Sequence, residues 1–209
     1  MSLFLILLGG ELTVTDRMLR QVAGARVIAA DSGIAHAEAL RAEPELWVGD
    51  FDSTTAEIAA RYEAVPRKAF PSEKDLTDGE IAIDAALALG AESILLAGAF
   101  GGTRADHAFL HLAAGLRLAE RGIPTLLTDG VQEGCAVLPG VTAFGYAPDT
   151  LFSVACFSDL SGLSISGARW PLDRIDVSFG SSLTLSNRVT GRLEIALRSG
   201  RAMLIAHPA

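Results

Sequence analysis

Short apolar runs alternate with stretches of helical character over the first 130 residues, and this alternation constrains the fold more than any other feature. The apolar runs are residues 4–8, 26–30, 46–48, 93–99 and 125–128. The helix-like stretches lie near residues 16–23, 33–42, 55–63, 78–89 and 106–121. Strands that are apolar throughout and are separated by helices typically form parallel sheets covered on both faces. We therefore predict an α/β domain with a mostly parallel sheet, in which ligands bind at the carboxyl ends of the strands.

The pattern changes after about Gly130. The later apolar runs are short, several of them alternate with polar residues, and Gly, Ser, Pro and Asp separate them; they are residues 151–157, 182–187, 192–197 and 202–206. No convincing amphipathic helix follows, which favours an all-β domain. We therefore predict an α/β domain over residues 1–130 and an all-β domain over residues 131–209.

The composition limits the partners of the chain. Half of the 209 residues are apolar and the formal net charge is −8, so the sequence predicts a globular core and no nucleic-acid partner. The opening apolar run lacks a basic start and is too short to span a membrane, so it is interpreted as a buried strand. Cys135 and Cys156 have neither CxxC nor zinc-finger spacing, which favours reduced thiols in a cytoplasmic protein.

The segment "GDFDS" places two acids around Phe51, directly after the apolar run at 46–48. If the strand continues through this segment, Asp50 and Asp52 share one side and Phe51 faces the core on the other. Two neighbouring carboxylates repel each other unless a proton or a cation lies between them. The pair therefore indicates a cation site at the carboxyl end of this strand.

Further acids follow other strands or begin helices. Asp31 and Asp106 could each cap the helix that follows. Thr77 and Glu80 have the spacing of a capping box, and Asp78 between them would suit the helix dipole. Capping does not account for the acidic pair in "GDFDS", and that pair favours a metal-centred site.

The candidate ligands favour a hard cation. They are carboxylates without thiolates or a histidine cluster, and oxygen ligands of this kind suit Mg²⁺ or Mn²⁺ better than zinc. His107 and His111 have helical i, i+4 spacing, but no third zinc ligand is evident, so they are interpreted as helix surface or core. Mg²⁺ held by a few carboxylates and by phosphate is the usual arrangement in nucleotide chemistry.

The segment "GAFGGTR" follows one apolar run and precedes a helix-like stretch. The chain has no GxxxxGK[ST] motif, which excludes a P-loop enzyme. Gly101 and Gly102 could let main-chain N–H groups approach phosphate oxygens, and Arg104 could form a two-bond contact with phosphate. Lys74 could supply a second positive charge.

Six motifs in this order resemble those of the thiamin pyrophosphokinase family: "ADSG", "GDFDS", "KDLTD", "GGTRADH", "RWPL" and "LSN". The resemblance extends over most of the chain. It implies an α/β nucleotide-binding domain followed by a small β-sandwich domain that binds thiamin, in a homodimer with its active site at the interface. It also implies the reaction: a pyrophosphoryl group passes from Mg²⁺-bound ATP to the hydroxyl of thiamin, giving thiamin diphosphate and AMP.

The resemblance assigns roles to individual residues. The catalytic positions are Asp50, Asp52, Asp78 and Asp106. The metal ligands are Asp31, Asp50, Asp52 and Asp78. The nucleotide and phosphate contacts are Asp31, Lys74, Asp75, Thr77, Gly101, Gly102 and Arg104. The contacts to thiamin are Trp170, Thr184, Ser186 and Asn187.

The chain departs from the family pattern at three positions. Ser32 stands where the family usually has glycine, His36 where asparagine is common, and Thr103 where the second glycine of "GGRxDH" is expected. These departures concern nucleotide contacts and leave every candidate carboxylate in place. Trp170 has a second interpretation as a core residue, and Ser186-Asn187 as an ordinary turn.

Two other functions fit parts of the pattern. One keeps the chemistry and changes the acceptor to another primary alcohol, such as a hydroxymethyl-dihydropterin. The other is a non-catalytic module that binds a nucleotide or thiamin. The "RWPL" and "LSN" segments favour thiamin over a pterin, and the set of costly carboxylates favours catalysis over mere binding.

Overall fold

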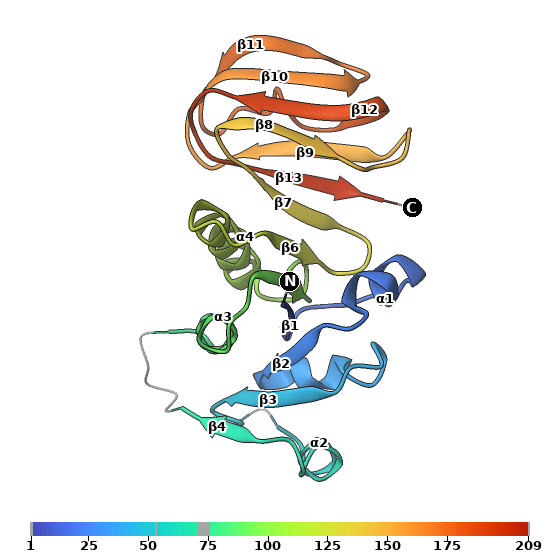
Figure 1. The fold of residues 1–209 in the computed structure, drawn as a ribbon, viewed down its shortest axis with the longest axis vertical. Coiled ribbons are helices and arrows are strands. Elements are labelled where there is room, and N and C mark those ends of the chain that lie inside the picture. The colour runs from blue at the N-terminus through green and yellow to red at the C-terminus, as the bar shows by residue number, and fades with distance from the viewer. Residues whose placement is uncertain (1, 53, 71–75, 209) are drawn as a thin grey trace. The chain divides into compact units, whose positions relative to one another are not determined.

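A computed structural model describes residues 2–52, 54–70 and 76–208 of the chain. The chain forms two compact units, one of Met1–Ala114 with Ile123–Gly130 and the other of Gly115–Gly122 with Val131–Ala209. The first contains alternating strands and helices, and the second contains antiparallel strands (Figure 1). This confirms the predicted order of an α/β fold followed by an all-β fold.

The sheet of the first unit is parallel. Its strands are β1 (Leu3–Leu7), β2 (Arg26–Ala30), β3 (Pro44–Gly49), β4 (Arg67–Ala69), β5 (Ser93–Ala97) and β6 (Thr125–Thr128). They lie in the order β6-β5-β1-β2-β3-β4, and each neighbouring pair is parallel. Strand β4 was not predicted, because all three of its residues are exposed and they form no apolar run.

Threonines cap three of the helices in the described part of the first unit. The helices are α1 (Asp16–Val22), the 3₁₀ helix η1 (Asp31–His36), α2 (Ala56–Arg61), α3 (Asp78–Ala88) and α4 (Ala105–Glu120). Thr15, Thr55 and Thr77 each accept a hydrogen bond from a main-chain N–H in the first turn of α1, α2 and α3. The prediction of an α-helix over residues 33–42 is wrong. A 3₁₀ helix starts at Asp31, and turns follow it.

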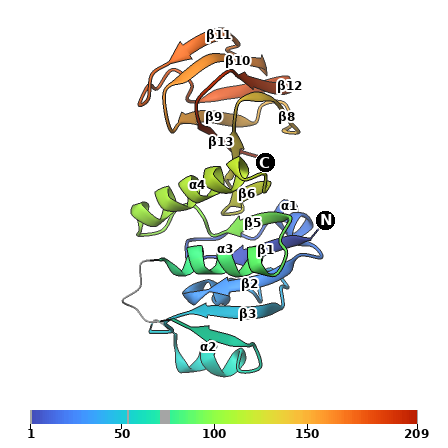
Figure 2. The same ribbon diagram turned by 60° about the vertical axis from the view of Figure 1, so that its left-hand side comes forward.

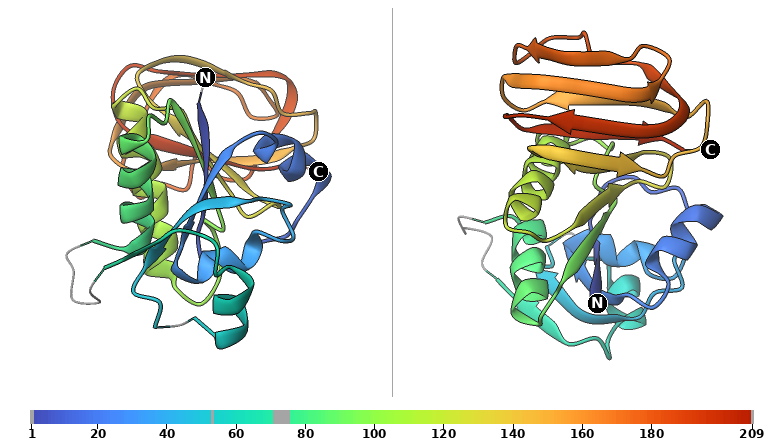
Figure 3. Two further views of the ribbon diagram at one scale, coloured as in Figure 1. Left: turned by 60° about the horizontal axis from the view of Figure 1, so that its bottom comes forward. Right: turned by 45° about the horizontal axis from the view of Figure 1, so that its top comes forward.

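Side chains from both faces of this sheet are buried, as the unbroken apolar runs predict. On one face, Leu5 and Trp47 pack with Met18 of α1 and Ile34 of η1. Helix α3 contacts β1, β2 and β3, and it lies over the sheet in Figure 2. Figure 3 shows α3 on one side of the sheet and α1 on the other.

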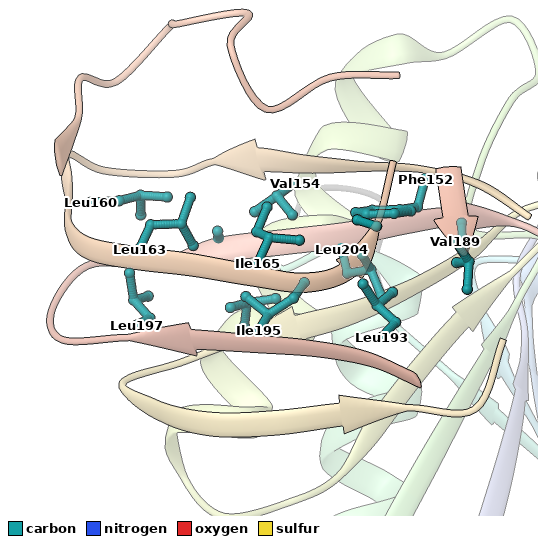
Figure 4. Packing of buried hydrophobic residues seen from close by; sticks show 14 of the residues in the cluster. Phe152, Val154, Leu160, Leu163, Ile165, Val189, Leu193, Ile195, Leu197 and Leu204 are labelled. Carbon is teal, nitrogen blue, oxygen red and sulfur yellow. The ribbon is translucent and has the colours of Figure 1, made fainter. Parts of the chain in front are cut away.

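The second unit has two antiparallel layers. Its strands are β7 (Glu133–Val137), β8 (Gly140–Phe144), β9 (Leu151–Cys156), β10 (Leu160–Ala168), β11 (Leu172–Val177), β12 (Asn187–Leu197) and β13 (Ala202–His207). Strand β13 pairs with β7 and β9, whereas β12 pairs with β8 and β10, and β10 pairs with β11. The core residues Phe152, Val154 and Leu204 lie opposite Ile165 and Ile195 in Figure 4. This arrangement agrees with the predicted sandwich.

One predicted apolar run in this unit is not a strand. Residues 182–186 form turns and bends, and β12 begins only at Asn187.

Cys135 and Cys156 form no disulfide. Across the described residues, every helix is too short or too polar to cross a membrane.

Candidate active site

Three carboxylates converge at the carboxyl ends of β2 and β3. One oxygen each from Asp31, Asp50 and Asp52 can be chosen so that all lie within 4.8 Å of one another. Asp31 and Asp50 are partly buried and Asp52 is exposed. Three carboxylates this close repel each other unless a cation or a proton lies between them, and their hard oxygen atoms fit Mg²⁺ or Mn²⁺.

The acidic pair is brought together by a turn and not by a strand. Strand β3 ends at Gly49, and Phe51 has a left-handed φ of 63°. The main-chain N–H of Asp52 donates to Oδ1 of Asp50 over 3.2 Å, which closes the turn. The sequence pattern predicts that strand alternation places Asp50 and Asp52 on one side. That explanation is wrong, because the β conformation stops one residue before Asp50. Phe51 still packs against the core, as predicted.

Gly49 allows β3 to end directly against Asp31. A Cβ atom at Gly49 would lie only 3.2 Å from both Cα and Cβ of Asp31. Asp31 itself has a φ of 42°, which is uncommon for a non-glycine residue. The carboxylate cluster therefore depends on a glycine that the motif "GDFDS" already contains.

A cleft of about 220 Å³ adjoins Asp31. It is formed by the segments that follow β1, β2 and β5 together with the first turns of α3 and α4. Its lining residues are Leu8, Gly9, Gly10, Ala30, Asp31, Ser32, Thr77, Asp78, Gly79, Gly98, Ala99, Gly101, Gly102, Thr103, Arg104, His107, Ala108 and His111. Two helix N-termini and a glycine-rich segment at one cleft favour an anionic ligand such as phosphate.

The first turn of α3 contributes Thr77 and Asp78 to this cleft. The Thr77 side chain accepts from the N–H of Glu80, and the Glu80 carboxylate accepts from the N–H of Thr77. The predicted capping box is thus confirmed. Asp78 lines the cleft with Asp31, but it is not in the group formed by the other three carboxylates.

Arg104 and Asp106 stand at the start of α4. The guanidinium donates two hydrogen bonds to the Asp106 carboxylate, from Nε over 3.0 Å and from Nη2 over 2.7 Å. The pairing raises the pKa of Arg104 and lowers that of Asp106 well below its ordinary range. Both groups are therefore charged at neutral pH, and the two hydrogen bonds orient Arg104 at the rim of the cleft, where both side chains are exposed.

The glycine-rich segment has the backbone that its sequence predicts. Gly101 and Gly102 have φ values of 68° and 83°, which glycine adopts without strain.

Two of the three departures from the family pattern, Ser32 and His36, have close neighbours in the structure. Ser32 lies against Gly9, where an added Cβ would be 2.3 Å from the serine Oγ. His36 Nε2 lies 2.9 Å from the main-chain oxygen of Gly10. The third, Thr103, is exposed at the rim.

His107 and His111 are partly buried on α4, and both also line the cleft. His111 Nδ1 lies 3.2 Å from the main-chain oxygen of Ala99, the segment that follows β5. Burial is the main reason why the pKa of His111 is lowered. Their position directly after "GGTRAD" was the available signal, since the first turns of that helix had to face the same edge as the glycines. Lys74 and Asp75 lie outside the described residues.

Trp170 in the second unit is 53% exposed, which excludes its interpretation as a core residue. Its main chain is held by the buried side chain of Asn187. The Asn187 amide accepts from the Trp170 N–H over 3.1 Å and donates to the Trp170 carbonyl over 2.8 Å. The Arg169 guanidinium lies 4.9 Å from the centre of the indole ring. The ring is thus presented to solvent on a fixed backbone.

The other predicted thiamin contacts differ in exposure. Thr184 is buried, and its hydroxyl donates to the main-chain oxygen of Val154 over 2.6 Å. Ser186 has a φ of 60°, and its N–H donates to the hydroxyl of Ser153 over 3.0 Å. Thr184 therefore fixes the turn that leads into Asn187, and Ser186 is exposed on it.

Comparisons with known proteins agree with both units. Residues 21–127 match the catalytic domain of thiamin pyrophosphokinase, and residues 147–202 match its vitamin B1 binding domain. The chain is also 31% identical over 163 residues to the thiamine pyrophosphokinase of Bacillus subtilis, covering 76% of this chain and 72% of that protein. The chain belongs to the thiamin pyrophosphokinase family. The resemblance found in the sequence motifs is confirmed.

Solved structures of thiamin pyrophosphokinases have the same fold. The crystal structure from Bacillus subtilis gives a TM-score of 0.86 at 23% identity and covers all of both chains. The structure from Geobacillus thermodenitrificans gives 0.81 at 28% identity, covering all of this chain and 98% of that one. The structure from Candida albicans gives 0.83 at 15% identity, covering all of this chain and 89% of that one. The order of the two folds is thus that of the thiamin pyrophosphokinase family.

Proposed function

We propose that this ATP-dependent transferase moves a pyrophosphoryl group from ATP to the hydroxyl of thiamin and that its cleft, with the carboxylates of Asp31, Asp50 and Asp52, is the nucleotide site. The observation that carries the proposal is the convergence of these carboxylates beside a cleft with two helix N-termini. Residues 1–130 then supply catalysis and residues 131–209 supply the thiamin contacts. We also propose that the enzyme works in the cytoplasm, as expected from the sequence.

The three clustered carboxylates fit a divalent cation, and we assign Mg²⁺ to them, with Asp78 as a further ligand from α3. When bound, Mg²⁺ would neutralise the carboxylates and the phosphates and hold the transferred group in line with the attacking hydroxyl. The protein holds Asp31 against Gly49 and Asp50 against the N–H of Asp52, so two of the ligands are oriented beforehand. Such positioning supplies much of the rate in phosphoryl transfer.

The phosphates occupy the side of the cleft formed by Gly101, Gly102 and Arg104. The exposed guanidinium of Arg104 can bind phosphate with two N–H groups. Asp106 acts on Arg104 by holding its planar group in place. Lys74, Asp75 and Thr77 belong to the nucleotide contacts implied by the family motif, and Thr77 also fixes the first turn of α3.

Thiamin contacts the exposed ring of Trp170, and Ser186 and Asn187 flank it. Thr184 acts through the turn, because its own hydroxyl is buried. The segment before Asn187 exposes Phe179, Leu183 and Leu185, which are 66%, 61% and 46% exposed. Exposed apolar side chains this close in sequence favour contact with a second subunit. We therefore include the homodimer, with its active site at the interface, in the proposal.

Product analysis tests the function. The purified enzyme receives Mg-ATP with thiamin, with a hydroxymethyl-dihydropterin, or with no acceptor, and its nucleotide products are separated by chromatography. We expect AMP and thiamin diphosphate in equal amounts, and only with thiamin. ADP as the coproduct would contradict the proposal. Turnover of the pterin alone would favour the other acceptor, and ATP binding without any turnover would favour a binding module.

A further inference from the structure

Trp47 lies beneath the carboxylate cluster and contacts both segments that form it. Its side chain is fully buried in the first unit. The indole N–H donates to the main-chain oxygen of Asp31 over 2.9 Å. The indole ring also meets the ring of Phe51 edge-on, with centroids 5.0 Å apart and an interplanar angle of 85°. One side chain therefore links the residue that begins η1 with the turn after β3.

Both linked residues have a backbone that needs support. Asp31 and Phe51 have φ values of 42° and 63°, a region that costs a residue with a side chain free energy unless its surroundings hold it there. The hydrogen bond from Trp47 fixes the carbonyl of Asp31, and the ring contact fixes the side chain of Phe51. Because Phe51 lies between Asp50 and Asp52, its placement sets where those two carboxylates lie.

Arg67 covers the outer side of this aromatic pair. Its guanidinium carbon lies 4.6 Å from the centre of the Trp47 ring and 5.8 Å from that of Phe51. The same guanidinium donates to the main-chain oxygen of Ala59 over 2.8 Å, which anchors it to α2. A cation over the faces of aromatic rings is attracted by their negative charge density. The edge strand β4 thus contributes to the support of the cluster.

We propose that Trp47 is a positioning residue that sets the spacing between Asp31 and the pair Asp50–Asp52, and through it the affinity for the divalent cation. The inference rests on the proposed function, because it assumes that these carboxylates hold the cation. A tryptophan serving only as core would act through its volume. A positioning tryptophan acts also through its N–H, which donates to the carbonyl of Asp31.

Trp47→Phe separates the two roles, because it keeps an aromatic ring and removes the donor. Phe51→Leu is a second variant, which keeps the N–H bond and loses the aromatic contact. Phe4→Leu is the matched control, because Phe4 is fully buried on β1 and, among the described residues, lies outside the hydrophobic cluster that contains Trp47 and Phe51. Binding of Mn²⁺ alone is measured by electron paramagnetic resonance of the free ion, and unfolding is followed in urea on the same samples.

We expect Trp47→Phe and Phe51→Leu to weaken Mn²⁺ binding about fivefold to tenfold, the effect of one net hydrogen bond or aromatic contact. Phe4→Leu should lower stability and leave the Mn²⁺ affinity unchanged. Wild-type Mn²⁺ affinity in Trp47→Phe or in Phe51→Leu would overturn this inference and leave the proposed function standing. If the wild-type enzyme binds Mn²⁺ no better than Asp52→Asn, the proposed metal site fails, and this inference fails with it.

Discussion

Arg104 and Asp106 are joined by two hydrogen bonds at the cleft although both side chains are mostly exposed. The pair orients a planar cation that lysine cannot reproduce. We expect Arg104→Lys to raise KM for ATP about tenfold and to change kcat less, as measured in steady-state assays. Arg61→Lys is the control, because Arg61 is also an exposed arginine in an ion pair but does not line the cleft. It pairs with Glu57 of α2 and with Glu38. Equal KM values for wild type and Arg104→Lys would count against a phosphate contact.

Asp52→Ala should lower kcat/KM by about two to four orders of magnitude, because positioning and electrostatics supply most of the catalysis of phosphoryl transfer. Asp52 is exposed, so its loss should leave the fold intact, which circular dichroism would verify. Asp84→Ala removes an exposed acid from α3 and should retain activity. A variant at Asp52 that keeps more than a tenth of the wild-type kcat/KM would exclude it as a principal ligand.

His111 should make stability depend on pH. Burial lowers the pKa of His111 in the folded protein below its ordinary value of about 6.5. The unfolded chain then binds the proton more tightly, so the free energy of unfolding falls as pH decreases below about 6.5 and levels off below the folded pKa. His111→Asn keeps a donor toward Ala99 and removes the titration. Urea unfolding at pH 7 and pH 5 should show a smaller decrease for this variant; identical decreases would refute the assignment.

Gly49→Ala should disturb the carboxylate cluster. The added Cβ would lie 3.2 Å from the Asp31 backbone, closer than such contacts normally are. We expect a loss of about 1–2 kcal/mol in unfolding free energy, typical of local overpacking, and at least tenfold lower kcat/KM. Gly90→Ala is the control, because Gly90 also has a positive φ but faces open space. If Gly90→Ala loses as much activity as Gly49→Ala, the loss comes from backbone strain in general and not from contact with Asp31.

Trp170→Ala should raise KM for thiamin about tenfold, because stacking on an aromatic ring contributes about 1–1.5 kcal/mol. Its ring is half exposed, so the stability of the second unit should change little. Trp170→Phe should retain most of the affinity. An unchanged KM in the alanine variant would remove Trp170 from the thiamin site.

The sequence predicts the parallel sheet well because its strands are buried on both faces and appear as unbroken apolar runs. Strand β4 has no such signal, since Arg67, Lys68 and Ala69 are all exposed. The turn at Phe51 is also hidden, because its left-handed backbone depends on Trp47, which precedes it in β3 and holds it by tertiary contact. The motifs in the sequence identify the acids of the site. They do not show that a turn, rather than a strand, brings these carboxylates together.

His111 illustrates a second limit of the sequence. Its spacing from His107 is common on any helix, and its place after the glycine-rich segment indicates only the edge of the sheet, not the contact of its ring with the main-chain oxygen of Ala99. Thr184 illustrates the opposite case. Its motif points to a ligand contact, whereas its hydroxyl is committed to Val154.

Asn187 holds both main-chain groups of Trp170 while the indole ring projects into solvent. The backbone at position 170 is thus independent of the side chain that it carries. Because the ring is half exposed, we expect rings of other sizes and polarities to be tolerated there. In the proposed thiamin site, position 170 is therefore the place to vary the ring that meets the acceptor, with Asn187 left untouched as the support for each new side chain.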